Sequence, residues 1–175
     1  DSKLSAPKNS NLKTVMDFSF FDKINTAKNE QTETWFKGLD RIYNNFVYDF
    51  LYPNPASVLA FIENHDTDRF LGEGNNLPML KQASTLLLTT RRIPQLYYGT
   101  EVMMNGVKSK SDGYVRKDFP GGWTGDATNA LTPAGRTKIQ NECYDFYKTI
   151  LNWRKGNDVI AKGSMVQGMV QNGVY

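Results

Sequence analysis

The stretch VLAFIENHDTDRF, residues 58–70, carries the strongest indication of the fold. It begins with an unbroken apolar run and changes at Asn64-His65-Asp66 into polar and ionisable side chains. A short continuous apolar run is typical of a strand buried on both faces, as in a parallel sheet. The polar residues that follow could form a turn that caps a helix. They could equally form an active site at the end of a strand, so the surrounding sequence has to separate the two interpretations.

The surrounding sequence alternates between short apolar runs and helical patterns. The predicted strands are residues 12–18, 58–62 and 93–98. The predicted helices are residues 33–47, residues 77–88 with Asn76 as cap, and a last helix that starts at Thr132-Pro133. This alternation predicts right-handed βαβ units and a parallel sheet, so the expected fold class is α/β.

Helical spacing also predicts which side chains face the core. In the first helix the inward residues would be Trp35, Phe36, Leu39, Ile42, Tyr43, Phe46 and Val47. In the last helix they would be Ile139, Cys143, Phe146, Tyr147, Ile150 and Trp153. Short alternating segments with glycines follow from residue 157 and predict hairpin strands that end at Tyr175.

Polar residues stand at the end of each predicted strand. Asp17 ends the first, Asn64-His65-Asp66 the second, and Tyr97 to Glu101 the third. Chemistry in parallel sheets is found at the carboxyl ends of the strands. This placement supports an active site at Asn64-His65-Asp66. In the alternative interpretation these residues cap the next segment, and Arg69 could pair with Asp66 or Asp68 at the surface.

Composition excludes several classes of function. The chain has 175 residues, a formal net charge of +3, and lysines that form no stripe, so a nucleic-acid partner is not expected. One cysteine permits no intrachain disulfide and, with one histidine, no zinc site built on cysteines. No apolar run reaches the ~18 residues of a membrane span. Scattered Asp and Asn do not define a calcium site, so metal binding stays open.

The segment of residues 99–131 is a long loop rich in Gly, Asn and Asp, and loops of that length are usually functional. Tyr97 and Tyr98 precede it, and Tyr114 and Trp123 lie within it. A sugar ring stacks its C–H face on aromatic rings, while its hydroxyls need polar partners. Aromatic side chains close to Asp, Asn, His and Arg are therefore compatible with a carbohydrate ligand, although core packing would also explain Tyr97 and Tyr98.

Four stretches together resemble the α-amylase family of glycoside hydrolases. FIENHD is similar to the family's strand that ends in Asn-His-Asp, and IPQLYYGTE is similar to its strand-eight segment. VRKDFPGGW resembles the loop after that strand in neopullulanase and cyclomaltodextrinase, and TVMDFSF resembles strand six. The resemblance implies the C-terminal part of a (β/α)8 TIM barrel, strands six to eight with their helices, followed by the start of a β-sandwich domain. The domains would be residues 1–156 and 157–175.

The resemblance also implies residue roles in a retaining enzyme that cleaves α-1,4-glucosidic bonds in maltodextrin, pullulan or cyclodextrin. Asp66 would be the catalytic carboxylate that stabilises the transition state. The implied substrate-binding residues are Asn64, His65, Arg116, Asp118 and Trp123, and the implied structural residues near the site are Glu101 and Tyr98. No cofactor is implied for this chain, Ca²⁺ in the parent enzyme stays open, and a starch-degrading bacterial parent would be periplasmic or secreted.

Retaining hydrolysis also needs a nucleophile and an acid/base carboxylate ~5–5.5 Å apart. The family takes these from strands four and five, and no GxRxD stretch occurs here. A barrel needs ~250 residues. We therefore expect an inactive fragment whose partners are an α-glucan and the missing N-terminal part of the barrel. A glucan-binding module and a self-associating fragment with exposed strand edges are the alternatives.

One position departs from the family pattern. Family members usually have Gly before the Ile-Pro of strand eight, where this chain has Arg92. If that position needs a positive φ, Arg92 would be strained by ~1–3 kcal/mol.

Overall fold

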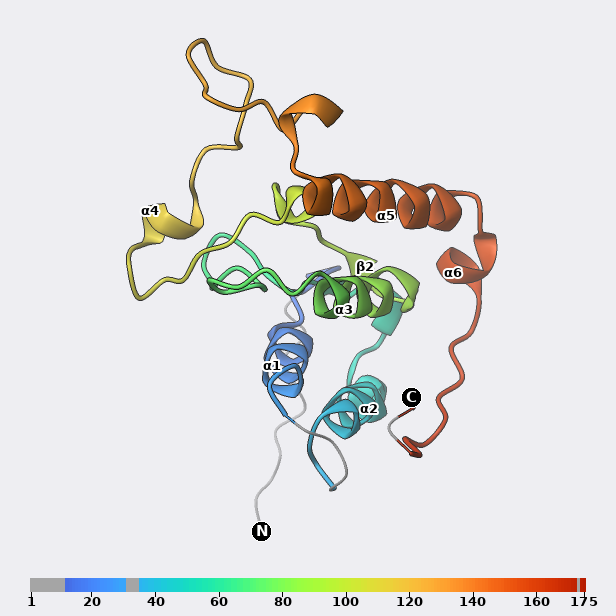
Figure 1. The fold of residues 1–175 in the computed structure, drawn as a ribbon. Coiled ribbons are helices and arrows are strands. Elements are labelled where there is room, and N and C mark those ends of the chain that lie inside the picture. The colour runs from blue at the N-terminus through green and yellow to red at the C-terminus, as the bar shows by residue number, and fades with distance from the viewer. Residues whose placement is uncertain (1–11, 31–34, 173) are drawn as a thin grey trace.

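The computed structural model of the chain describes residues 12–30, 35–172 and 174–175. These residues are mostly helical, with a small parallel sheet among the helices (Figure 1). The helices are α1 (Phe18–Ala27), α2 (Leu39–Val47), α3 (Leu77–Thr89), α4 (Asp112–Val115), α5 (Lys138–Lys155) and α6 (Asp158–Lys162). The strands are β1 (Leu59–Ala60) and β2 (Ile93–Pro94). Short 3-10 turns are η1 (Tyr48–Leu51), η2 (Pro55–Ser57), η3 (Thr100–Val102) and η4 (Pro133–Gly135).

The sheet confirms the predicted parallel arrangement but is shorter than expected. Leu59 pairs with Ile93, and Met16 forms a parallel bridge to Leu59 on the other side. The order in the sheet is therefore the order in the sequence. The prediction of a strand over residues 12–18 is wrong, because Met16 forms only an isolated bridge there. Asp17 then accepts the Phe20 N–H at 2.8 Å and starts α1.

Helix caps explain where the other helices begin. Asn76 accepts the Met79 N–H and starts α3, as predicted. The last helix begins later than predicted, because Thr132 and Pro133 form η4. Thr137 and Gln140 then make the capping box that starts α5.

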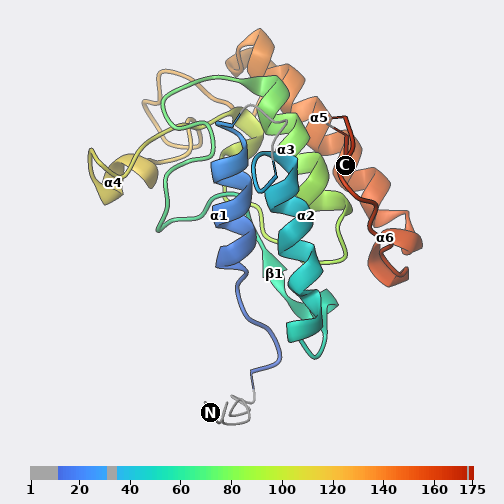
Figure 2. The same ribbon diagram turned by 90° about the horizontal axis from the view of Figure 1, so that it is seen from below.

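The core forms where α1, α2, α3 and α5 meet the strands, with α1 packed beside α2 and α3 packed beside α5 (Figure 2). Its fully buried members include Phe20, Ile62, Leu80 and Leu87. Each such side chain contributes ~1.5–3 kcal/mol relative to an exposed one. Because Ala60 and Ile62 belong to this core, its packing holds the carboxyl end of β1 in place.

The predicted inward faces are only partly confirmed. Cys143 and Tyr147 of α5 are buried, with Phe146 and Ile150 packed against the core. The inward assignment of Ile139 and Trp153 is wrong, because they are 38% and 47% exposed. In the first predicted helix, Trp35 and Phe36 precede α2 and are exposed, and the start of that prediction falls on residues outside the described range.

The last predicted segment also differs. Asp158–Lys162 forms the helix α6, with Asn157 as its cap, where strands were expected. After α6, Gln171 and Val174 form an isolated antiparallel bridge. No β-sandwich is formed by the described residues, because one bridge gives no sheet face to bury. The domain boundary at residue 156 stays a prediction.

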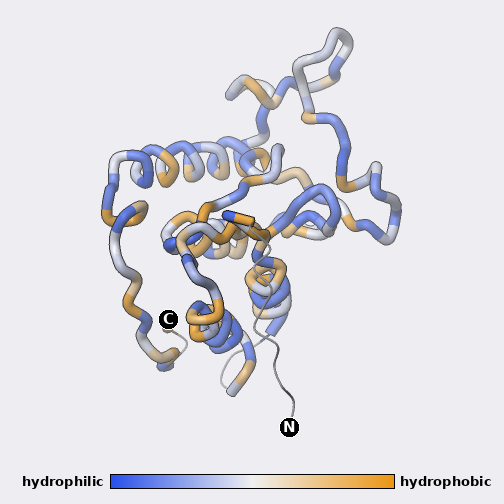
Figure 3. Tube along the Cα trace, turned by 180° about the vertical axis from the view of Figure 1, so that it is seen from behind, coloured by the Kyte–Doolittle hydropathy of each residue, from blue (hydrophilic) through white to orange (hydrophobic). Residues whose placement is uncertain are grey.

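The loop between η3 and η4 projects away from the helices and is mostly hydrophilic (Figures 1 and 3). It carries α4 near its middle and returns to the body of the molecule at η4. Its first half passes the carboxyl end of β1, where the candidate site lies.

Candidate active site

The chain leaves β1 in a tight turn held by Asn64. The buried Asn64 side chain accepts the Asp66 N–H at 2.8 Å, and the Thr67 hydroxyl accepts the Asn64 N–H at 3.0 Å. This turn directs the side chains of His65 and Asp66 away from the core, where they are 57% and 56% exposed. The predicted site residues are therefore accessible at the end of a buried strand.

The Asp66 carboxylate has a partner on each oxygen. Its Oδ1 lies 2.9 Å from an Arg116 guanidinium nitrogen, and its Oδ2 lies 3.1 Å from Nε2 of His65. Arg116 Nε also donates to the His65 carbonyl at 2.8 Å, and Lys108 Nζ donates to the Asp66 carbonyl at 2.9 Å. The structure thus brings together the predicted residues Asn64, His65, Asp66 and Arg116.

A buried acid lies directly below the turn and was missed by sequence reasoning. Glu63 accepts hydrogen bonds from the Thr100 hydroxyl and the Phe70 N–H, and it pairs with Arg69 at 3.3 Å. Burial raises the pKa of Glu63, while these donors and the charge of Arg69 act in the opposite direction. The sequence does contain a signal for this buried group, because Glu63 directly follows the apolar run that ends at Ile62.

The prediction of a surface position for Arg69 is wrong. Arg69 is 1% exposed, and its guanidinium stacks on Tyr97 at 3.9 Å and on Tyr98 at 4.9 Å. Its NH1 donates to the Tyr98 carbonyl at 2.7 Å, and its Nε donates to the Val115 carbonyl at 3.0 Å. Arg69 therefore joins the ends of both strands to the loop that carries Arg116.

Tyr97 and Tyr98 lie against the guanidinium of Arg69. The two rings are 4.6 Å apart, and burial together with the Tyr98 hydroxyl raises the pKa of Tyr97 to about 12. The following Gly99 has φ +82°, and a Cβ there would lie 2.2 Å from the Met104 sulfur. Gly99 is thus required for the turn that returns the chain under the site.

Three other predicted site residues make no contact with Asp66 in the described part of the chain. Trp123 is 72% exposed, and its backbone N–H donates to Asp126 within the loop. Asp118 is exposed in the same loop. Glu101 is half-buried in η3, where its charge contributes to the raised pKa of Cys143 on α5. Their roles at a substrate site stay predictions.

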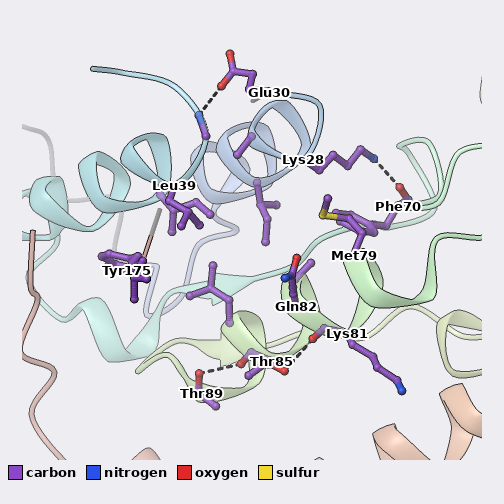
Figure 4. A pocket seen from close by; sticks show the side chains of 17 residues that line it. Lys28, Glu30, Leu39, Phe70, Met79, Lys81, Gln82, Thr85, Thr89 and Tyr175 are labelled. Carbon is purple, nitrogen blue, oxygen red and sulfur yellow. Dashed lines mark hydrogen bonds between the residues drawn. The ribbon is translucent and has the colours of Figure 1, made fainter. Parts of the chain in front are cut away.

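One cleft borders the Asp66 turn, and a second lies away from it. One of about 440 Å³ lies between α1 and the turn, lined by Phe21, Asn25, Lys28, Asp66 and Asp68 among others. Another of about 730 Å³ lies between α1, α2 and α3 and is mainly apolar (Figure 4). Only the first includes Asp66, so it is the cleft relevant to the candidate site.

The described residues include no group of three or more His, Cys, Asp or Glu side chains that could hold a metal ion. The same part of the chain contains no helix long and apolar enough to cross a membrane.

A sequence model described as the catalytic domain of alpha amylase matches residues 5–130, more than half of the chain. The chain belongs to the α-amylase family. The stretch FIENHD and the site around Asp66 lie inside the matched range. The predicted family is therefore confirmed, whereas likeness to neopullulanase and cyclomaltodextrinase in particular stays a prediction.

Relatives in the family are much longer than this chain. A cyclomaltodextrin glucanotransferase of Thermoanaerobacterium thermosulfurigenes is 32% identical over 93% of the chain and 20% of that protein. An alpha-amylase of Niallia circulans is 30% identical over 93% of the chain and 27% of that protein. The chain thus spans about a fifth to a quarter of the length of these relatives.

Solved structures are similar in fold. The Gamma-CGTase of alkalophilic Bacillus clarkii has a TM-score of 0.58 at 25% identity, over 83% of this chain and 18% of that one. An alpha-amylase of Geobacillus thermoleovorans, solved with acarbose, has a TM-score of 0.64 at 23% identity. The latter match covers 86% of this chain and 30% of that one. The chain therefore folds as part of an α-amylase catalytic domain.

Proposed function

We propose that the chain supplies one part of the active site of a retaining glycoside hydrolase that cleaves α-1,4-glucosidic bonds. The observation that carries the proposal is the Asp66 carboxylate, held by Arg116 and His65 at the end of β1 in a member of the α-amylase family. In this proposal the strand positions of Met16, β1 and β2 correspond to barrel strands six, seven and eight. Maltodextrin, pullulan and cyclodextrin are the proposed substrates.

Asp66 would act on the charge that develops during cleavage. The transition state of glycoside hydrolysis resembles an oxocarbenium ion, so positive charge grows on the sugar as the bond breaks. A carboxylate fixed near that charge stabilises the transition state more than the neutral substrate. The partners of Asp66 keep its orientation, and Arg116 and Asp112 form a second ion pair at 3.3 Å that holds the arginine.

His65 would contact the hydroxyls of the same sugar. Its imidazole is exposed beside Asp66, so one ring N–H can donate to a sugar oxygen. Asn64 was predicted to bind the substrate, but its side chain is buried and accepts the Asp66 N–H, so in this proposal Asn64 acts only by fixing the turn. Asp118 and Trp123, which do not line the cleft beside Asp66, would contact sugar units farther along the glucan.

This chain alone is proposed to be inactive. Cleavage with retention needs a nucleophile and an acid/base carboxylate in addition to Asp66. The sequence lacks the family motif for the nucleophile. A polypeptide that supplies the remaining strands of the barrel would complete the site.

Two assays test the proposal. The purified chain is incubated with maltodextrin, pullulan and cyclodextrins, and no reducing sugar above a no-protein blank is expected. Calorimetric titration with maltoheptaose then compares the wild type with Asp66→Asn and with the control Asp22→Asn, an exposed carboxylate that also has a cationic partner. We expect weak binding that is lost in Asp66→Asn and retained in Asp22→Asn, while equal binding by all three would refute the proposed role.

Self-association is a second candidate for the behaviour of this polypeptide. Among the described residues, Met16 and β2 each have a strand neighbour on one side only, and Val15, Ile93 and Leu96 are exposed. Unpaired strand edges and apolar side chains favour association. Sedimentation of the chain would show concentration-dependent dimers if this holds, and a compact monomer at all concentrations if it does not.

A further inference from the structure

We propose that Arg69 is a positioning residue that holds the loop carrying Arg116 so that Arg116 and Lys108 engage the Asp66 turn. The relevance of this device to glucan recognition rests on the proposed function. The geometry itself does not, because it concerns contacts within the free chain.

The side chain of Arg69 is held in one conformation by its surroundings. Its side chain is fully buried, paired with Glu63 and packed against the rings of Tyr97 and Tyr98, which follow β2. A buried guanidinium with a charged partner and two aromatic faces has little freedom to choose another conformation. Arg69 therefore presents its remaining donors in set directions.

Two N–H groups of Arg69, one on its backbone and one on its side chain, hold the two ends of one segment. The backbone N–H of Arg69 donates to the Gly106 carbonyl at 3.0 Å, and its Nε donates to the Val115 carbonyl at 3.0 Å. The segment of residues 106–115 includes α4 and leads directly into Arg116. Arg69 thus sets the position of this part of the long loop.

The residues carried by this segment contact the turn. Lys108 Nζ reaches the Asp66 carbonyl at 2.9 Å, and Arg116 reaches the Asp66 carboxylate and the His65 carbonyl. All three contacts join residues more than 40 positions apart in the sequence. These contacts therefore form only when the loop is held close to the turn. The exposed side chains of Lys108 and Arg116 are not sufficient to hold the loop there.

His65 is the only histidine of the chain, so its imidazole signals in an NMR spectrum report this contact without ambiguity. The experiment compares wild type, Arg69→Lys, Arg116→Ala and the double variant in the free chain. Lysine keeps the charge beside Glu63 but lacks the Nε donor for Val115. We expect Arg69→Lys to move the His65 signals in the same direction as Arg116→Ala, and the double variant to move them no further than Arg116→Ala does.

Arg136→Lys is the matched control. Arg136 is also buried, stacks on Tyr144 at 3.9 Å, and donates to the Ala130 carbonyl at 2.8 Å. Its replacement should lower the urea midpoint of unfolding without moving the His65 signals. If Arg69→Lys does not fold, Arg69→Met combined with Glu63→Gln removes both buried charges together and should give the same His65 shift.

The inference is overturned if the His65 signals of Arg69→Lys coincide with wild type while Arg116→Ala moves them. It is also overturned if the two substitutions add in the double variant, since independent effects would show that Arg69 does not act through Arg116. A maltoheptaose titration of the same proteins separates this inference from the proposed function. Failure of the wild type to bind would count against the proposed function alone. If it binds, Arg69→Lys should weaken affinity on the order of tenfold.

Discussion

Replacing Arg92 by methionine should destabilise the chain far more than the same change at its neighbour Arg91. Arg92 is 1% exposed and lies between Asp17 at 3.1 Å and Asp49 at 2.5 Å. It also faces the ring of Tyr52 at 5.3 Å. Methionine would fill much of the space but would leave the Asp17 carboxylate, which is 1% exposed, without a cation.

The structure gives the magnitude of this effect. Removing one partner of a buried ion pair costs ~3–5 kcal/mol, because the other charge stays buried and uncompensated. Arg91 also pairs with Asp49, but its side chain is 28% exposed, and Asp49 would retain Arg92. Its replacement should therefore cost ~1 kcal/mol or less. Both variants lower the net charge by one, so the comparison is matched in long-range electrostatics.

Urea unfolding followed by tryptophan fluorescence and circular dichroism measures the difference. With a slope of ~2 kcal/mol per molar urea, Arg92→Met should lower the midpoint by ~1.5–2.5 M and Arg91→Met by less than ~0.5 M. Adding Asp17→Asn to Arg92→Met should restore part of the loss, since the uncompensated charge is then absent. Equal midpoints for Arg91→Met and Arg92→Met would refute the reasoning.

Three further predictions concern titrating groups. Burial raises the pKa of the Cys143 thiol to about 12. Ellman's reagent should therefore not label the native chain at pH 8, but should label it at once in concentrated urea. Rapid labelling of the native chain would contradict the buried position. Burial raises the pKa of Glu63 above 4.5, so its stabilising effect is greatest below pH 4.5 and is lost as pH rises. The stability of wild type relative to Glu63→Gln should therefore fall from pH 4.5 to pH 7, and a pH-independent difference would argue against that burial. Hydrogen bonds from Arg41 lower the pKa of Glu30 to about 2, so stability relative to Glu30→Gln should be present above pH 4.5 and vanish near pH 2, as acid unfolding curves of both proteins can show.

Local sequence patterns predict the end of β1 and the start of α3 better than the extent of the other elements. The apolar run before Asn64-His65-Asp66 located a buried parallel strand, because both its composition and its abrupt polar end are local properties. Asn76 likewise predicted the start of α3. The helix α1 was missed, because its aromatic residues match a strand as well as a helix and the Asp17 cap decides between them.

Contacts between distant segments could not be predicted from local patterns. Arg69 is buried only because Tyr97, Tyr98 and Val115 come from segments far along the chain. The position of Arg92, where the family resemblance predicts glycine, also depends on contacts with distant segments. The described non-glycine residues with positive φ are Phe36, Met103 and Asn172, so the conditional prediction of strain at Arg92 does not apply. Its side chain instead completes an ion-pair cluster drawn from three separate segments.

In the proposed function, Asp66 is the transition-state-stabilising carboxylate of a site that this chain supplies only in part. A chimera can test this role in a complete enzyme, with this chain in place of the matched fifth of the Thermoanaerobacterium thermosulfurigenes cyclomaltodextrin glucanotransferase. In a chimera that forms cyclomaltodextrin from an α-1,4-glucan, we predict that Asp66→Asn lowers kcat by ~10²–10³-fold, as loss of a transition-state charge contact does, while Asp22→Asn leaves it unchanged. An Asp66→Asn chimera that turns over as fast as its parent would contradict the account.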